Sequence, residues 1–167
     1  MKAPPEPPVA ARPPDVDWQW CRFDGLDVRK LQAIHRARQQ VFIVEQACAF
    51  LDADVYDEVA FHLCAWPPGR AEPFAYARVI DPGAKYDEPS IGRVLTASAA
   101  RGQGLGREIV RQAIARTQDA WPQRDIRISA QSRLEAFYAA FGFAPVGERY
   151  LDDGIAHTDM LLAWSER

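Results

Sequence analysis

The sequence predicts an α/β (α+β) fold in which a mixed, mostly antiparallel central sheet of about seven strands is flanked by helices. Three observations support this prediction. Short apolar or alternating segments, typical of strands, are separated by Pro-Gly and Asp-Gly turns that favour antiparallel neighbours. Segments with helical periodicity interrupt these strands. One such helix lies between two strands, which permits a parallel crossover there.

The chain begins with a proline-rich tail and then enters the predicted domain. Residues 1–14 contain six prolines and few apolar side chains, which indicates a disordered tail ahead of one domain at residues 15–167. Alternation in residues 16–20 predicts the first strand. Asp27 is expected to cap a helix that runs to about Val44. The apolar face predicted for this helix consists of Val28, Leu31, Ile34, Val41 and Phe42.

The middle of the chain combines an aspartate-rich loop with two strands. The loop covers residues 45–59, and the strands are predicted at residues 60–66 and 74–80. Pro67-Pro68-Gly69 closes the first strand and Asp81-Pro82-Gly83 closes the second. Each of these two strands is therefore expected to turn back onto an antiparallel neighbour.

The C-terminal half predicts four strands and two helices. In order, these are a strand at 90–96, a helix at 105–118, a strand at 126–130, a helix at 132–141, and strands at 144–150 and 156–164. Ser132 and Glu135 have the spacing of a capping box at the start of the second helix. Asp152-Asp153-Gly154 predicts a tight hairpin between the last two strands.

Composition and charge disfavour several classes of protein. At 167 residues, with 48% hydrophobic and 26% charged side chains, the chain is typical of one globular domain. A net charge of −3 predicts no nucleic-acid or membrane partner, and no apolar run approaches the ~20 residues of a membrane span. The N-terminus shows no signal-peptide pattern. Three dispersed cysteines indicate neither disulfides nor zinc, and free thiols fit a reducing cytoplasm, so we expect a cytoplasmic protein without a metal. Its expected oligomeric state is a monomer or a homodimer.

A glycine-rich segment at residues 101–106 is the strongest functional signal. It follows a strand and opens a helix, so its backbone N–H groups and the positive end of the helix dipole form a site for phosphate. Its glycines lack Cβ, which lets the backbone approach an anion closely. The spacing G-x-G-x-G differs from the dinucleotide fingerprint, and the Gly-Lys-Ser/Thr end of a Walker loop is absent.

Two motifs in the chain resemble those of the GCN5-related N-acetyltransferase (GNAT) superfamily. Arg101, Gly104 and Gly106 match its Gln/Arg-x-x-Gly-x-Gly/Ala loop, and residues 137–143 (FYAAFGF) match its Tyr-x-x-x-Gly-Phe segment. Within the superfamily, the chain from about Val16 onward is similar to the ElaA-like proteins. The matching stretches are VFIVEQ at 41–46, IGRV at 91–94, the glycine loop, Ala130-Gln131, the 137–143 segment and DDGIAH at 152–157.

This resemblance implies a sheet that splays between its fourth and fifth strands and binds acetyl-CoA there. The pyrophosphate is expected on the glycine loop, and the pantetheine arm along the backbone of the strand that precedes the loop. The residues expected to bind acetyl-CoA are Val94, Leu95, Thr96, Arg101, Gly102, Gln103, Gly104, Leu105, Gly106, Gln131 and Tyr138. Gln131 stands where many members of the superfamily carry Asn, and its longer side chain keeps the amide chemistry.

The resemblance also implies a catalytic acid and leaves the base open. Tyr138 is expected to protonate the departing CoA thiolate, and the alternative is that it only packs on the pantetheine arm. An ammonium cannot attack and has an unperturbed pKa of about 10, so a base or a water chain must remove a proton. Glu45 lies on the side where the family binds acceptors, and it is either this base or an exposed helix-end carboxylate.

Three further residues are candidate contacts for the acceptor, namely Arg38, His62 and His157. A structural role for His62 and a surface position for His157 are the alternatives. The acidic side chains of the loop at 45–59 lack the glycine and the final glutamate of a calcium loop. We expect these carboxylates to be solvated. The alternative is that they attract a cationic amine acceptor. In either case, an ion pair with Arg38 is expected to tether the loop.

The function predicted from the sequence is an N-acetyltransferase that transfers acetyl from acetyl-CoA to a small-molecule or peptide amine by direct attack. A non-catalytic acetyl-CoA-binding module is one alternative. The other is acyl transfer similar to that of acyl-homoserine-lactone synthases. The pattern of Arg38 and Phe42 followed by an aspartate-rich loop resembles the pattern found in those enzymes. The intact glycine loop disfavours that second alternative, because such a loop suits a CoA pyrophosphate.

Overall fold

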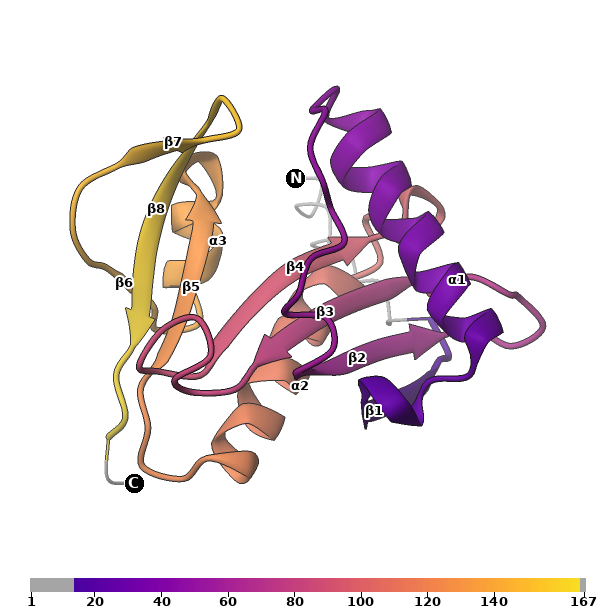
Figure 1. Cartoon of the computed structure of the whole chain (residues 1–167), viewed down its shortest axis with the longest axis horizontal. Coiled ribbons are helices and arrows are strands. Elements are labelled where there is room, and N and C mark those ends of the chain that lie inside the picture. The colour runs from indigo at the N-terminus through magenta and orange to yellow at the C-terminus, as the bar shows by residue number, and fades with distance from the viewer. Residues whose placement is uncertain (1–13, 166–167) are drawn as a thin grey trace, which may run out of the picture.

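The strands form one open sheet in a computed structural model that describes residues 14–165 (Figure 1). Of the tail predicted at residues 1–14, only Pro14 falls within the described residues. In this part of the chain the sheet has eight strands in the order β1-β2-β3-β4-β5-β8-β6, with β7 paired to β8. The strands are β1 (Asp17–Arg22), β2 (Ala60–Trp66), β3 (Ala75–Ile80), β4 (Ser90–Thr96), β5 (Ile126–Gln131), β6 (Ala144–Pro145), β7 (Tyr150–Asp152) and β8 (Ile155–Leu162).

One pair in this sheet is parallel, and the other pairs are antiparallel. The parallel pair is β4 with β5, which are joined through helix α2 (Leu105–Ala120). The neighbouring strands β1, β2, β3 and β4 pair antiparallel in sequence order, and β8 pairs antiparallel with β5, β6 and β7. The predicted mixed, mostly antiparallel sheet and its single crossover are thus confirmed.

Helices cover both faces of the sheet (Figure 1). Helix α1 (Val28–Arg38) packs on one face of the sheet and continues as a π-helical segment, η2 (Gln39–Glu45). The helix predicted to end at about Val44 therefore has the expected length, but its last seven residues are π-helical. Helices α2 and α3 (Glu135–Ala139) pack on the opposite face. Short 3-10 turns are found at Phe23–Gly25, Ser98–Ala100 and Ser132–Leu134.

Each face of the sheet has its own apolar core. On the α2 face, Leu105 and Ile109 are fully buried among residues of the central strands. On the α1 face, Ile34 packs with Tyr76 and Leu95. Val28 was expected on this apolar face, but its side chain is 81% exposed, because the buried residues of α1 all lie in its second half.

Two of the local signals in the sequence are confirmed atom by atom. Asp27 caps α1, since its Oδ1 accepts hydrogen bonds from the backbone N–H groups of Arg29 and Lys30, both at 2.9 Å. The turn between β7 and β8 places Asp153 at φ 48° and Gly154 at φ 78°, the two positive values that a type I′ hairpin requires.

Two predictions for the C-terminal half are wrong. The capping box does not form: Glu135 instead accepts a hydrogen bond from Thr158 Oγ1 at 2.6 Å and pairs with Arg149, and α3 is correspondingly short. The strand predicted at residues 144–150 is divided into β6 and β7. Gly147 lies between the two pieces at φ 76°, a left-handed conformation that a continuous strand cannot contain.

Candidate active site

A cleft opens where β4 and β5 separate. Within residues 14–165 these strands pair at Ser90 and Arg127, and Figure 1 shows them diverging from that point. The cavity between them has a volume of about 810 Å³. Among the residues that line it are Glu45, Val94, Leu95, Thr96, Arg101, Gly106, Gln131, Tyr138 and His157, all of them predicted site residues. The splay implied by the sequence therefore brings most of the predicted donor site into one cleft.

The edge of β4 that faces the cleft offers free backbone groups. β4 pairs with β3 along its other edge, with a register shift opposite Arg93, which adopts φ 48°. Such a bulge redirects the strand. Within residues 14–165, β5 pairs with β4 only at Ser90, so the later N–H and C=O groups on the β5 side of β4 face the cavity, where an extended ligand arm can pair with them.

The glycine loop at the end of this cleft is shaped for an anion. Gly102 and Gly104 adopt φ 75° and 79°, values that favour glycine, and Gly104 is the N-cap of α2. A Cβ on Gly106 would approach Thr96 Oγ1 to 3.3 Å. The backbone N–H groups of residues 102–106 donate to no carbonyl within residues 14–165, so they are available at the positive end of the helix dipole.

Tyr138 brings a buried phenol to the same cleft. The residue is 7% exposed and packs edge-on against Phe137 and Phe143. Burial raises the pKa of Tyr138 to about 12, and neither a charge nor a hydrogen-bond partner in the described residues contributes to this shift. The phenol is therefore protonated at neutral pH and can donate that proton.

Glu45 and Arg101 meet across the cleft. Arg101 Nη2 lies 2.6 Å from Glu45 Oε2, and Arg101 Nε donates to the carbonyl of Thr96 at 3.0 Å. The ion pair joins the end of η2 to the start of the glycine loop. The candidate base and a predicted contact of the pyrophosphate thus neutralise each other in this state of the molecule.

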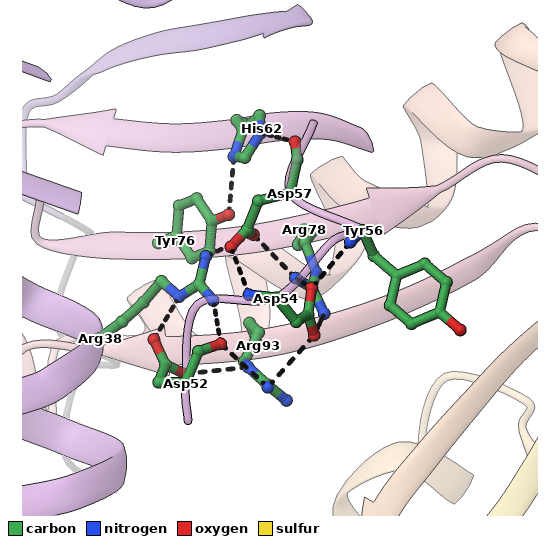
Figure 2. A network of polar contacts seen from close by, with 9 residues as sticks. All are labelled: Arg38, Asp52, Asp54, Tyr56, Asp57, His62, Tyr76, Arg78 and Arg93. Atoms are coloured by element: carbon green, nitrogen blue, oxygen red, sulfur yellow. Dashed lines mark hydrogen bonds and ion pairs between the residues drawn. The ribbon is translucent and has the colours of Figure 1, made fainter. Parts of the chain in front are cut away.

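Arg38, an expected acceptor contact, is instead part of a buried ion-pair network (Figure 2). Its side chain has no exposed surface and does not line the cleft. Arg38 Nε donates to Asp52 Oδ2 at 2.8 Å, and Nη1 donates to Asp57 Oδ1 at 2.6 Å. The predicted tether between Arg38 and the acidic loop is present, but it engages the whole guanidinium.

The same network corrects the expectation that the acidic loop is solvated. Asp52 and Asp57 are buried, Arg78 of β3 donates to Asp57 at 2.7 Å, and Arg93 of β4 pairs with Asp52 at 2.9 Å (Figure 2). Burial opposes the ionisation of Asp57, but its hydrogen bonds and charge interactions with the arginines outweigh burial and lower its pKa to about 2. These carboxylates anchor the loop to the sheet, because arginines surround them.

His62 also lies outside the cleft, in a hydrogen-bonded structural position. Its Nδ1 is 2.8 Å from Tyr76 Oη, and its Nε2 is 2.9 Å from the carbonyl of Asp57 (Figure 2). Burial lowers the pKa of His62, which favours the neutral imidazole. This position matches the structural alternative for His62.

His157 lines the cleft beside a polar chain that the sequence did not reveal. Its ring stacks on Tyr150, with centroids 6.1 Å apart. Tyr150 Oη donates to Asp159 at 2.8 Å and is 2.5 Å from Ser129 Oγ, which also lines the cleft. Pairing of β5 with β8 places Ser129 opposite Asp159, a proximity that no local pattern could have indicated.

Neither a metal-binding cluster nor a membrane-spanning helix is found in the part of the chain that the structure describes. No group of three or more His, Cys, Asp or Glu side chains within residues 14–165 is placed to hold a metal ion. In the same part of the chain, every helix is too short or too polar to span a membrane.

Comparison with known proteins decides the family. A family model described as an acetyltransferase (GNAT) domain matches residues 70–163, more than half of the chain. This chain belongs to the GNAT acetyltransferase family. The GNAT motifs identified in the sequence, the glycine loop and the segment ending in Gly142-Phe143, both lie within the matched residues.

Relatives of similar length match most of the chain. A UPF0039 protein of Synechocystis is 43% identical over 150 residues, which are 88% of this chain and 95% of the relative. Protein ElaA of Escherichia coli is 34% identical over 147 residues, which are 87% of this chain and 95% of ElaA. The predicted similarity to ElaA-like proteins is confirmed.

Solved structures of other proteins share the fold. An acyl-CoA N-acyltransferase from Pseudomonas aeruginosa superposes with a TM-score of 0.85 at 37% identity, covering 89% of this chain and 100% of that one. The acyl-homoserine-lactone synthase LasI superposes with a TM-score of 0.72 at 16% identity, covering 89% of this chain and 90% of that one. At this identity the likeness is one of fold alone. Family and fold together identify an acyltransferase.

Proposed function

We propose that this GNAT protein is an N-acetyltransferase that transfers acetyl from acetyl-CoA to the amine of a small molecule or peptide. One observation carries the proposal: a single cavity runs from the glycine loop, at Arg101 and Gly106, to the buried phenol of Tyr138. The loop suits a pyrophosphate, and the phenol suits a leaving thiolate. A CoA thioester has both groups.

The backbone of the cleft would bind most of the donor. N–H groups of residues 102–106 would hold the pyrophosphate, and the free edge of β4 from Val94 to Thr96 would pair with the pantetheine arm. Arg101 would turn from Glu45 to the pyrophosphate. That exchange would release the Glu45 carboxylate at the moment when the donor is in place.

Proton transfers then complete the chemistry. The acceptor ammonium loses a proton to Glu45, directly or through water. Its nitrogen bonds to the acetyl carbon while a backbone N–H of β4 stabilises the oxyanion. The carbon–sulfur bond breaks, the CoA sulfur takes the proton of Tyr138, and the new amide loses its remaining extra proton to solvent. Glu45 then releases its proton to solvent and the Tyr138 phenolate takes one up, which restores both side chains. His157, on the wall of the cleft, is a candidate contact for the acceptor.

Thermal unfolding tests the donor, with ATP and NADH as control ligands. A ligand at ~100 times its Kd adds about 2.7 kcal/mol of stability if it binds only the folded state. For a domain of this size, that is a rise in Tm of roughly 5–10 °C. Of the three ligands, only acetyl-CoA should produce this rise in Tm. A panel of amines, monitored by release of the CoA thiol, should then identify the acceptor. A rise without thiol release for any amine favours the non-catalytic alternative, and no rise overturns the proposal.

A further inference from the structure

Three side chains form a bridge across the cleft between η2 and β5. Gln131, the last residue of β5, donates from Nε2 to Gln46 Oε1 at 3.0 Å, over a separation of 85 residues. Arg133 Nε donates to Gln131 Oε1 at 3.0 Å. All three residues line the cavity that holds the donor in the proposed function.

The arginine determines the orientation of both amides. A guanidinium has donors and no acceptor, so the group of Gln131 that it contacts must be the carbonyl oxygen. The NH₂ group of Gln131 then points to Gln46, whose own carbonyl oxygen must accept. In consequence the NH₂ group of Gln46 is turned away from the bridge, and it donates no hydrogen bond within residues 14–165.

The position of Gln46 limits what this donor can meet. Its neighbour Glu45 contacts Arg101 at the glycine loop, and its partner Gln131 precedes the turn that leads to Tyr138. Gln46 therefore stands between the two ends of the donor site, beside the stretch that the acyl–pantetheine arm would occupy. That arm offers carbonyl oxygens, from two amides and one thioester, which are acceptors without donors of their own.

We propose that Gln46 binds a carbonyl oxygen of the acyl–pantetheine arm through its Nε2, with Gln131 and Arg133 as positioning residues. This inference rests on the proposed use of an acyl-CoA. It gives Gln131 an indirect role, since both ends of its amide are already engaged. If the oxygen is that of the thioester, Gln46 also stabilises the charge that develops there during attack.

Calorimetry with three ligands tests this inference without a known acceptor. Acetyl-CoA has the thioester and both amides, CoA has the amides only, and adenosine 3′,5′-bisphosphate has no arm. Gln46→Leu should raise the Kd of acetyl-CoA about threefold to tenfold, the loss of one net hydrogen bond. Adenosine 3′,5′-bisphosphate should bind both proteins equally. Gln39→Leu, the same change on the exposed side of η2, is the matched control and should alter none of the three affinities.

The pattern of losses decides among the outcomes. Weaker binding of acetyl-CoA alone assigns Gln46 to the thioester, and equal weakening of acetyl-CoA and CoA assigns it to a pantetheine amide. Unchanged binding of all three, or equal weakening of all three, overturns the inference while the proposed function stands. Failure of the unchanged protein to bind acetyl-CoA or CoA overturns both. Arg133→Met, which leaves Gln46 in place, should produce a smaller loss than Gln46→Leu, and Arg133→Lys should restore part of it.

Discussion

Tyr138 shows how burial keeps one side chain in its protonated form. Its phenol is surrounded by aromatic rings, so the pKa rises to about 12 and the proton is retained across the neutral range. The same ring also forms part of the wall of the cleft, so Tyr138 has two candidate roles there, as acid and as packing surface.

Substitution of Tyr138 by Phe separates these two roles. The ring and its packing are kept, so the Kd of acetyl-CoA should stay unchanged. The CoA thiolate loses its proton donor, and kcat should fall by about 10²-fold or more. In the unchanged enzyme, kcat should not decline through tyrosine ionisation below about pH 10, because the acid stays protonated below its pKa of about 12. Full turnover by the Phe variant would assign Tyr138 a packing role only.

At the scale of elements, the junction between β4 and α2 carries the proposed donor site. The strand ends at Thr96, a short 3-10 turn follows, and Gly104 starts the helix in a left-handed conformation. The helix dipole and the free N–H groups of the loop act at the same point, so their attraction for a phosphate adds.

Gly104→Asp should abolish the binding of acetyl-CoA measured by calorimetry. The change places a negative charge and a Cβ beside the expected pyrophosphate, at φ 79°. Gly83→Asp is the matched control, because Gly83 has φ 83°, lies in a Pro-Gly turn and has open space around its Cβ position. Both variants carry the same backbone strain, and the control should bind acetyl-CoA normally. Equal affinities of the two variants for acetyl-CoA would contradict the assignment of the pyrophosphate to this loop.

At the scale of the whole molecule, the ion-pair network joins one helix, two neighbouring strands of the sheet and one loop. Arg38 comes from α1, Arg78 from β3 and Arg93 from β4, and the carboxylates of one loop pair with all three (Figure 2). The network holds this loop against the sheet, and Asp54 within it also lines the cleft. The acceptor side of the proposed site therefore depends on a network that is buried at Arg38 and Asp57 and partly exposed at Asp54.

Asp57→Asn should destabilise the protein by about 3–5 kcal/mol, since removal of one partner leaves buried arginine charge unpaired. Thermal unfolding should show a Tm lower by roughly 6–20 °C for a domain of this size. Asp81→Asn removes an exposed ion pair with Arg22 and should cost less than about 1 kcal/mol. Equal losses in the two variants would show that burial of the network contributes nothing.

Acidification should weaken the same network in two steps. The pKa of His62 is lowered by burial from its ordinary 6.5, so the unfolded chain takes up this proton first and stability begins to fall below about pH 6.5. The pKa of Asp57 is lowered from 3.8 to about 2, so a second loss should occur between about pH 4 and pH 2. In Asp57→Asn the second step should be diminished, which denaturant titrations at several pH values can measure.

Much of the fold was predictable because its signals are local. Asp27 caps a helix through bonds to its own neighbours, Asp153-Gly154 favours a hairpin by its backbone preferences, and the glycine loop is defined by spacing alone. Local signals failed where a distant group competed for the same atoms. Glu135 has the spacing of a capping box, yet Thr158, which lies 23 residues away, occupies its carboxylate.

The amino-acid sequence by itself determined the family, the order of the elements and the position of the glycine loop, since each depends on residues close together along the chain. Only the tertiary structure decided that the acidic loop is buried against three arginines, that Arg38 and His62 lie outside the cleft, and that Gln46 meets Gln131 across it. These contacts join residues separated by up to 85 positions. The energies of these contacts depend on which strands become neighbours and on how much water the packing removes. No short segment of the chain determines either of these.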